Sequence, residues 1–256
     1  MTLNKHEFPI LECDTEQSSI LMPNRKRLYK LTQKCVFAFL GDYVEKYALQ
    51  SNSRKVAEFD TCTKLFNIYE TSYKGKDIAI CAAPLGASAA VQYLDFLISY
   101  GVRHIIACGS CGTLRDIPEN EILIPISALR GEGTSYHYVP PAREIALNRA
   151  AVRAIEAAAS YYKIPFEECK AWTTDGYYRS TKDMVEYRKQ EGCDVVEMEC
   201  SALAACAQFR NAIFGQILFT ADTLAIPDAH DDRGWGESSW ENAFKLSLEA
   251  VHRIED

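Results

Sequence analysis

Two places in the sequence contain residues that could bind a polar or aromatic ligand. In each place these residues come shortly after an apolar run. Gly109 and Ser110 follow the apolar run 104–108, and a turn of small residues there could hold an anion with its N–H groups and hydroxyls. Tyr177 comes shortly after Trp172, and an exposed aromatic face can stack on a planar ring. A tight turn without a ligand, or aromatic residues that only fill the core, would give the same pattern.

Two further places carry carboxylates. Glu197 and Glu199 flank Met198 where an apolar run passes into a helical pattern. Helix capping explains one acid at a helix start, whereas a second could accept two hydrogen bonds from a vicinal diol such as that of ribose. Asp222 follows the apolar run 214–220. An aspartate after a strand is usually a turn former, but a half-buried one could act as a general acid near neutral pH.

Short strands and amphipathic helices must position these residues. Apolar runs rich in β-branched and aromatic residues predict strands at 19–22, 35–40, 65–69, 78–82, 104–108, 122–126, 195–196 and 214–220. Helical spacing predicts helices at 87–98, 151–162, 198–209 and 244–251. Two irregular stretches, 131–141 and 228–237, are long enough to be functional loops.

This alternation predicts an α/β, single-domain, three-layer fold with a central mostly parallel or mixed sheet covered by helices on both faces. No repeat, linker or charge block divides residues 1–256, so we expect one domain. Ligands of open α/β sheets bind beyond the carboxyl ends of the strands. The four places described above, each with candidate binding or catalytic residues, all follow predicted strands. We therefore expect them to form one site.

The charge balance excludes several classes of partner. The chain has 256 residues, 48% of them apolar, and a net charge of -7 from 28 Lys+Arg against 35 Asp+Glu. Such a surface repels phosphate backbones and anionic lipids, so neither nucleic acid nor a membrane is an expected partner. No apolar run approaches the roughly 18 to 20 residues that a membrane helix needs, and the first residues lack the apolar core of a signal peptide. We therefore expect a cytoplasmic protein.

The ten cysteines fit the same compartment, because most lie in apolar runs where a reduced thiol packs as a small hydrophobe. Cys108 and Cys111 form one CxxC pair, a spacing found in redox sites and in half of a zinc site. The five histidines are scattered and none has ligand spacing. We expect no metal.

Five segments, taken in order, resemble those of the nucleoside phosphorylase superfamily, which includes uridine phosphorylase, bacterial purine nucleoside phosphorylase and the methylthioadenosine nucleosidases. They are 108–112 (CGSCG), 130–137 (RGEGTSYH), 173–178 (TTDGYY), 196–199 (VEME) and 221–222 (AD). The Glu-Met-Glu element between a strand and a helix is the most specific of them. The resemblance covers nearly the whole chain.

This resemblance implies an enzyme that cleaves a nucleoside with inorganic phosphate as co-substrate, without a metal or organic cofactor, and that works as a homo-oligomer between a dimer and a hexamer. It also implies roles for individual residues. These are Gly109 and Ser110 on phosphate, Tyr177 on the base, Met198 under the ribose, Glu199 with Glu197 beside it on the ribose hydroxyls, Asp222 protonating N7 of a purine, and His6 reaching the ribose of a neighbouring subunit.

The chain departs from the family in its phosphate clamp. Leu28 and Ala107 stand where arginines usually lie, and a dianion needs guanidinium or N–H partners to offset its desolvation. Arg130 and Arg179 are the candidates to replace them. Two alternatives stay open: a nucleoside hydrolase that uses water in the same pocket, and a nucleoside-binding relative without activity.

The base-reading residues depart as well. The glutamine and arginine by which uridine phosphorylases read uracil are replaced by Thr181 and Asp183. Asp222 instead points toward a purine, because it matches the acid of the purine-specific members. Divergent members of the family include uridine phosphorylases, so the resemblance leaves both the purine and the uridine type open.

Overall fold

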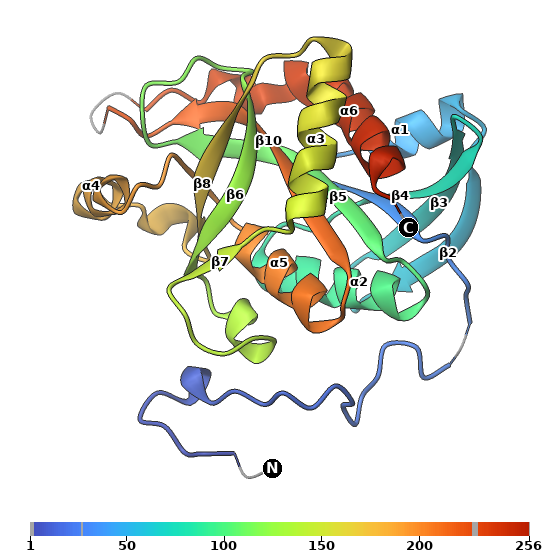
Figure 1. Cartoon of the computed structure of the whole chain (residues 1–256), viewed down its shortest axis with the longest axis horizontal. Coiled ribbons are helices and arrows are strands. Elements are labelled where there is room, and N and C mark those ends of the chain that lie inside the picture. The colour runs from blue at the N-terminus through green and yellow to red at the C-terminus, as the bar shows by residue number, and fades with distance from the viewer. Residues whose placement is uncertain (1–2, 27, 227–229, 256) are drawn as a thin grey trace.

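Ten strands form one sheet at the centre of the protein (Figure 1), seen in a computed structural model that describes residues 3–26, 28–226 and 230–255. The strands are β1 (Lys34–Ala38), β2 (Arg54–Asp60), β3 (Leu65–Tyr73), β4 (Lys76–Ala82), β5 (His104–Thr113), β6 (Ile122–Gly131), β7 (Glu144–Ala146), β8 (Phe166–Thr174), β9 (Val195–Glu197) and β10 (Ile213–Thr223). Their order is β10-β6-β8-β9-β5-β1-β4-β3-β2, with β7 beside β6.

The sheet is mixed, as the alternation of strands and helices predicts. Strand β1 pairs in parallel with β4 and β5, whereas β2, β3 and β4 form antiparallel neighbours. The sheet is not open throughout, because β10 pairs with both β5 and β6. Strands β10, β6, β8, β9 and β5 therefore close into a ring. Hydrophobic periodicity carries no information on pairing, so the sequence did not predict this closure.

Helices cover both faces of the sheet, which confirms the three-layer prediction. They are α1 (Tyr43–Gln50), α2 (Ala87–Ser99), α3 (Arg149–Tyr162), α4 (Lys182–Gln190), α5 (Cys200–Phe209) and α6 (Trp240–Arg253), with 3₁₀ turns η1 (Pro9–Leu11), η2 (Thr134–His137), η3 (Tyr177–Arg179) and η4 (Arg233–Ser239). Helices α2 and α5 pack together, and α3 packs on α6. None of the helices in the described ranges is long and apolar enough to cross a membrane.

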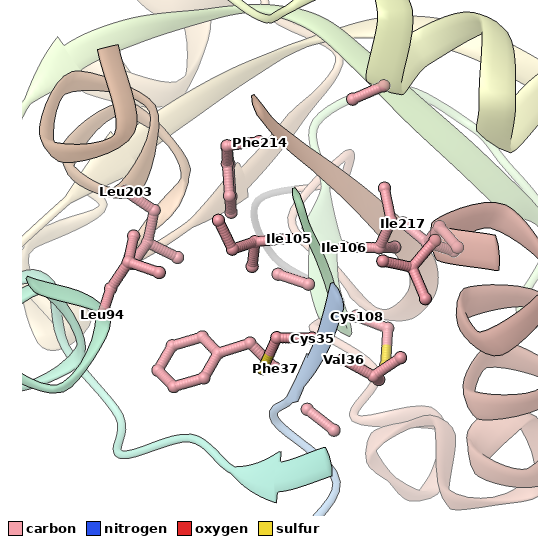
Figure 2. Close-up of a cluster of buried hydrophobic side chains, with 14 of the residues drawn as sticks. Cys35, Val36, Phe37, Leu94, Ile105, Ile106, Cys108, Leu203, Phe214 and Ile217 are labelled. Carbon is pink, nitrogen blue, oxygen red and sulfur yellow. The ribbon is translucent and has the colours of Figure 1, made fainter. Parts of the chain in front are cut away.

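Alternate residues of the central strands point to opposite faces of the sheet and pack into the core on either side (Figure 2). Ile105 of β5 and Phe214 of β10 are neighbours in the sheet and lie near Leu94 of α2 and Leu203 of α5. On the opposite face, α3 comes very close to β10. A Cβ atom at Gly215 would lie 2.8 Å from Cβ of Ala151, so glycine is the residue that permits this approach.

One predicted strand is wrong. Residues 19–22 contain no strand, and Ile20 and Leu21 are exposed. They belong to an extended N-terminal segment that runs outside the sheet (Figure 1). An apolar run becomes a strand only where a neighbour offers hydrogen bonds, and this segment has none beside it in the described sheet.

The predicted turn at Gly109 and Ser110 is also wrong, because β5 continues to Thr113. Its small residues do not end the strand, since β10 pairs with it on one side and β9 on the other. Ser110 faces Phe219 in this register. The backbone of this segment is therefore committed to the sheet and does not form the anion-holding loop that the sequence suggested.

A buried lysine ties the first strand of the sheet to the last helix. The side chain of Lys34 is almost fully covered. Its ammonium group donates hydrogen bonds to the carbonyl oxygen of His252, at 3.1 Å, and to that of Ile254. These carbonyls lie at the C-terminus of α6, where a positive charge is favoured.

Replacing Lys34 by methionine should lower the free energy of unfolding by about 1.5 to 3 kcal/mol, because charge-assisted hydrogen bonds to buried carbonyls are lost. The matched control is Lys46→Met, which removes an exposed ion pair with Asp42 and should cost under about 1 kcal/mol. Urea unfolding of both variants measures the difference. Equal losses in the two variants would contradict the assigned role of Lys34.

Candidate active site

A cavity of about 520 Å³ opens where β5, β8, β9 and β10 end. Its lining consists of Leu85, Ser110, Cys111, Gly112, Thr174, Tyr177, Tyr178, Ser180, Val196, Glu197, Met198, Glu199, Asp222, Leu224, His230 and Trp235. Six of the ten site residues predicted from the sequence are among them: Ser110, Tyr177, Glu197, Met198, Glu199 and Asp222. The structure therefore brings together all four places that carry candidate binding or catalytic residues.

Glu197 is the buried anchor of the cavity. Its carboxylate accepts hydrogen bonds from Oγ1 of Thr173 at 2.6 Å and from the backbone N–H groups of Glu199 at 2.8 Å and Cys200 at 2.7 Å. Burial raises the pKa of Glu197, and these hydrogen bonds oppose the shift. The carboxylate thus joins the ends of β8 and β9 to the first turn of α5.

Glu199 lies at the N-terminus of α5 and is 5% exposed. Its Oε1 accepts a hydrogen bond from the backbone N–H of Gly86, the N-cap residue of α2. Burial, together with the charge of Glu197, raises the pKa of Glu199 to about 8. A carboxyl group buried at a cavity wall, with so large a shift, is a candidate for contact with substrate.

Asp222 is presented by an irregularity in β10. The pairing of β10 with β5 shifts register between Thr220 and Thr223, and such bulges re-aim side chains next to active sites. The carboxylate lies over Gly112, where an added Cβ would come within 3.1 Å of Oδ1 of Asp222 and 2.8 Å of Cδ1 of Leu224. A residue with a side chain at position 112 would displace the acid.

Three aromatic side chains stand at the mouth of the cavity. Tyr177 and Tyr178 contact each other edge to face, with ring centroids 4.8 Å apart. Trp235 lies beside His230, and the centroids of their two rings are 6.3 Å apart. All three are substantially exposed. Tyr177 lines the same cavity as Asp222, and burial together with the charge of Asp222 raises the pKa of Tyr177. Such faces suit a planar aromatic ligand.

Sequence reasoning missed His230 and Trp235, and it assigned no role to Tyr178, although this residue lies in the segment 173–178. His230 is the most informative omission, because its Nε2 lies 3.1 Å from Oδ2 of Asp222. The available signal was the irregular stretch 228–237, which contains both His230 and Trp235. Residues 227–229 lie outside the described part of the chain.

Arg130 is placed differently from the prediction. Its buried guanidinium donates to Oγ of Ser135 at 2.9 Å and to the carbonyl oxygens of Pro140 at 2.8 Å and Val139 at 3.3 Å. It also stacks on the ring of Tyr136. The prediction of a cationic phosphate ligand in this cavity is corrected accordingly: Arg130 braces the loop that follows β6.

Three other predicted residues also lie outside the cavity lining. Gly109 packs against Phe39, so that an added Cβ would lie 2.9 Å from its Cβ. Arg179 is exposed at the end of η3. His6 is exposed in the N-terminal segment, where its Nδ1 accepts from the N–H of Phe8. Its contact with the ribose of a neighbouring subunit stays a prediction.

The CxxC pair does not form a reactive dithiol. Cys108 and Cys111 are both buried. Burial raises the pKa of the Cys108 thiol to about 12 and that of Cys111 well above its ordinary value, which disfavours the reactive thiolate. Across the described ranges, no group of three His, Cys, Asp or Glu side chains is placed to hold a metal ion.

A sequence model of the phosphorylase superfamily matches residues 34–253 of the chain. The protein therefore belongs to the phosphorylase superfamily. The guanosine phosphorylase of Halorubrum lacusprofundi is 24% identical over 193 residues, which are 73% of this chain and 80% of that protein. The DeoD-type purine nucleoside phosphorylase of Brevibacillus brevis is 28% identical over 194 residues, 70% of this chain and 77% of that protein.

Solved structures share the fold. Uridine phosphorylase from Vibrio fischeri superposes with a TM-score of 0.74 at 21% identity, covering 91% of this chain and 93% of that one. Purine nucleoside phosphorylase from Toxoplasma gondii gives 0.76 at 19% identity, with 89% and 92% covered. AMP nucleosidase from Bacteroides thetaiotaomicron gives 0.71 at 20% identity, with 91% and 95% covered.

The two glutamates should respond oppositely to removal of their charge. Glu197→Gln should lower the free energy of unfolding by about 1.5 to 3 kcal/mol, because three donors lose a charged acceptor. For Glu199→Gln, the free energy of unfolding should instead rise relative to that of the wild type as pH increases. The folded state binds a proton at Glu199 more tightly than the unfolded chain does, because its pKa of about 8 exceeds the ordinary 4.5. Wild-type stability is therefore lost between these two pH values.

Thermal or urea unfolding at several pH values between about 5 and 9 measures both effects. The gap between wild type and Glu199→Gln should widen with pH. A gap that stays constant with pH would contradict the buried, protonated state of Glu199. Destabilisation by Glu199→Gln but not by Glu197→Gln would reverse the assignment of anchor and substrate contact.

Proposed function

We propose that this protein cleaves the N-glycosidic bond of a purine nucleoside, with inorganic phosphate as the attacking nucleophile and without a metal or organic cofactor. The observation that carries the proposal is one cavity that contains the buried carboxyl group of Glu199, the carboxylate of Asp222 and the exposed ring of Tyr177. A nucleoside has one feature for each of them: a vicinal diol, a basic nitrogen and a planar ring.

The difficulty of the reaction defines the roles. The bond breaks through an oxocarbenium-like sugar, and the departing base is a poor leaving group unless it is protonated. Asp222 donates a proton to N7 of the purine, which lets the base leave as a neutral molecule. Glu199 accepts hydrogen bonds from the ribose hydroxyls and fixes the sugar, while Tyr177 stacks on the base.

A purine is favoured over uracil by the surroundings of the base. The positions that would read uracil are occupied by Thr181 and Asp183. Both residues belong to the N-terminal end of helix α4. Thr181 caps its N-terminus by accepting a hydrogen bond from the N–H of Met184, and Asp183 lies in its first turn. Neither lines the cavity. An acid beside the base suits a purine, whose N7 is a basic nitrogen.

Phosphate as nucleophile is supported by the sequence relatives, which are named as phosphorylases. Hydrolysis by water is the second candidate, and a specific observation favours it. The described residues of the cavity wall include three carboxylates and one histidine but no lysine or arginine. A phosphate dianion needs charged or N–H donors to offset its desolvation, whereas water needs none.

A nucleoside panel with and without phosphate separates these reactions. We expect release of hypoxanthine from inosine and of guanine from guanosine, with uridine cleaved at least about 10-fold more slowly. Omitting phosphate should abolish turnover. Turnover that is independent of phosphate would assign a hydrolase, and nucleoside binding without release of any base would assign a binding protein. Chromatography of the free base measures all outcomes.

Glu199→Gln should lower kcat/KM for inosine by about 10- to 100-fold, because the amide has one acceptor oxygen where the carboxyl group of Glu199 offers two oxygens to the ribose diol. The loss should be smaller for 2′-deoxyinosine, which lacks one of the two hydroxyls already. The same pair of substrates with Glu186→Gln, an exposed acid of α4, provides the control. Equal losses of kcat/KM for inosine and 2′-deoxyinosine would show that Glu199 does not bind the ribose diol.

A further inference from the structure

A histidine faces the acid of the cavity. Nε2 of His230 lies 3.1 Å from Oδ2 of Asp222, and the two side chains are 52% and 17% exposed. The contact joins residues eight positions apart across the loop that follows β10. A backbone bond holds the returning segment in place, because the N–H of Thr223 donates to the carbonyl oxygen of Asp231 at 3.0 Å.

The start of the loop is fixed as well. The N–H of Leu224 donates to the carbonyl oxygen of Thr113 at 2.8 Å, which extends the contact between β10 and β5 beyond the strands. His230 is therefore brought to Asp222 by main-chain bonds on both sides of the loop. Its imidazole contributes nothing to the core, since half of it is open to solvent and its ring neighbour is the partly exposed Trp235.

We propose that His230 is a positioning residue that holds Asp222 and resupplies the proton which Asp222 gives to the leaving base. The inference rests on the proposed function and deepens it. A general acid must be reloaded after each turnover, and a ligand in the cavity would cover the side of Asp222 that lines it. The imidazole has the exposure to exchange protons with water. Histidine is also the side chain that changes its protonation state near neutral pH.

The proton balance is simple. Asp222 transfers its proton to N7 of the purine while the C1′–N9 bond breaks and its electron pair goes to the base. The nucleophile forms the new bond to C1′. The imidazolium of His230 then passes its Nε2 proton to Asp222 across the hydrogen bond, and water reprotonates the imidazole. No oxidant, metal or further reactant is required.

The test compares two substrates that differ only in their need for this proton. Inosine must be protonated at N7 before its base leaves easily. In 7-methylinosine a methyl group at N7 gives the base a fixed positive charge, so that no acid is needed. His230→Gln should lower kcat/KM for inosine by about 10- to 100-fold and that for 7-methylinosine by less than about 3-fold.

Two further variants frame the result. Asp222→Asn should show the same pattern with a larger loss on inosine, because it removes the acid itself. His137→Gln makes the same change at an exposed histidine outside the cavity and should leave both substrates unaffected. Retained activity on 7-methylinosine shows that each variant is folded.

The outcomes are distinguishable. Equal losses on both substrates in His230→Gln, or no loss on either, would overturn the role of His230 and leave the proposed function standing. Wild-type protein that cleaves neither inosine nor 7-methylinosine would overturn the proposed purine chemistry and the role of His230 with it.

Discussion

The burial of two carboxyl groups, two residues apart, is the constraint on which the site depends. Glu197 satisfies its charge with a hydroxyl and two backbone N–H groups. Those bonds fix the turn between β9 and α5. Glu199 lies in this turn, so its position is set by the same bonds. The charge of Glu197 also helps to raise the pKa of Glu199. Glu197 therefore holds the wall of the cavity, while the buried carboxyl group of Glu199 lines the space that a ligand would enter.

The opposite wall depends on the ladder between β5 and β10. This pairing closes the ring of strands and continues through the small residues of β5 up to Thr113. It sets Asp222 over Gly112, where only a glycine leaves room for the carboxylate. The irregularity in β10 turns the acid toward the cavity, and the loop beyond it returns His230 to the same carboxylate. The Glu199 side and the Asp222 side of the cavity thus arise from different parts of one sheet.

Sequence reasoning predicted the parts of this arrangement that depend on local pattern. The helices at 87–98, 151–162 and 198–209 are confirmed by α2, α3 and α5, because amphipathic spacing over several turns is specific. The gathering of Ser110, Tyr177, Glu199 and Asp222 in one cavity is also seen in the structure. It could be predicted because residues that end adjacent strands meet at one edge of a sheet.

The failures share a physical cause, which is long-range pairing. Small residues usually end a strand, but those of β5 stay in the ladder because neighbours bind both edges. Arg130 carries a charge suited to phosphate, yet the carbonyl groups of its own loop take its N–H donors. The partnership of His230 with Asp222 depends on where a loop returns. None of these contacts leaves a periodic trace in the sequence.

The proposed function requires that Glu199 hold the sugar and that Asp222 face the base of a purine nucleoside. A crystal structure of the protein with a purine C-nucleoside, whose carbon–carbon glycosidic bond cannot be cleaved, tests it most directly. We expect ribose hydroxyls within hydrogen-bond distance of the Glu199 carboxyl group and the five-membered ring of the base turned toward Asp222. A sugar bound away from Glu199, or a base that makes no contact with Asp222, would contradict it.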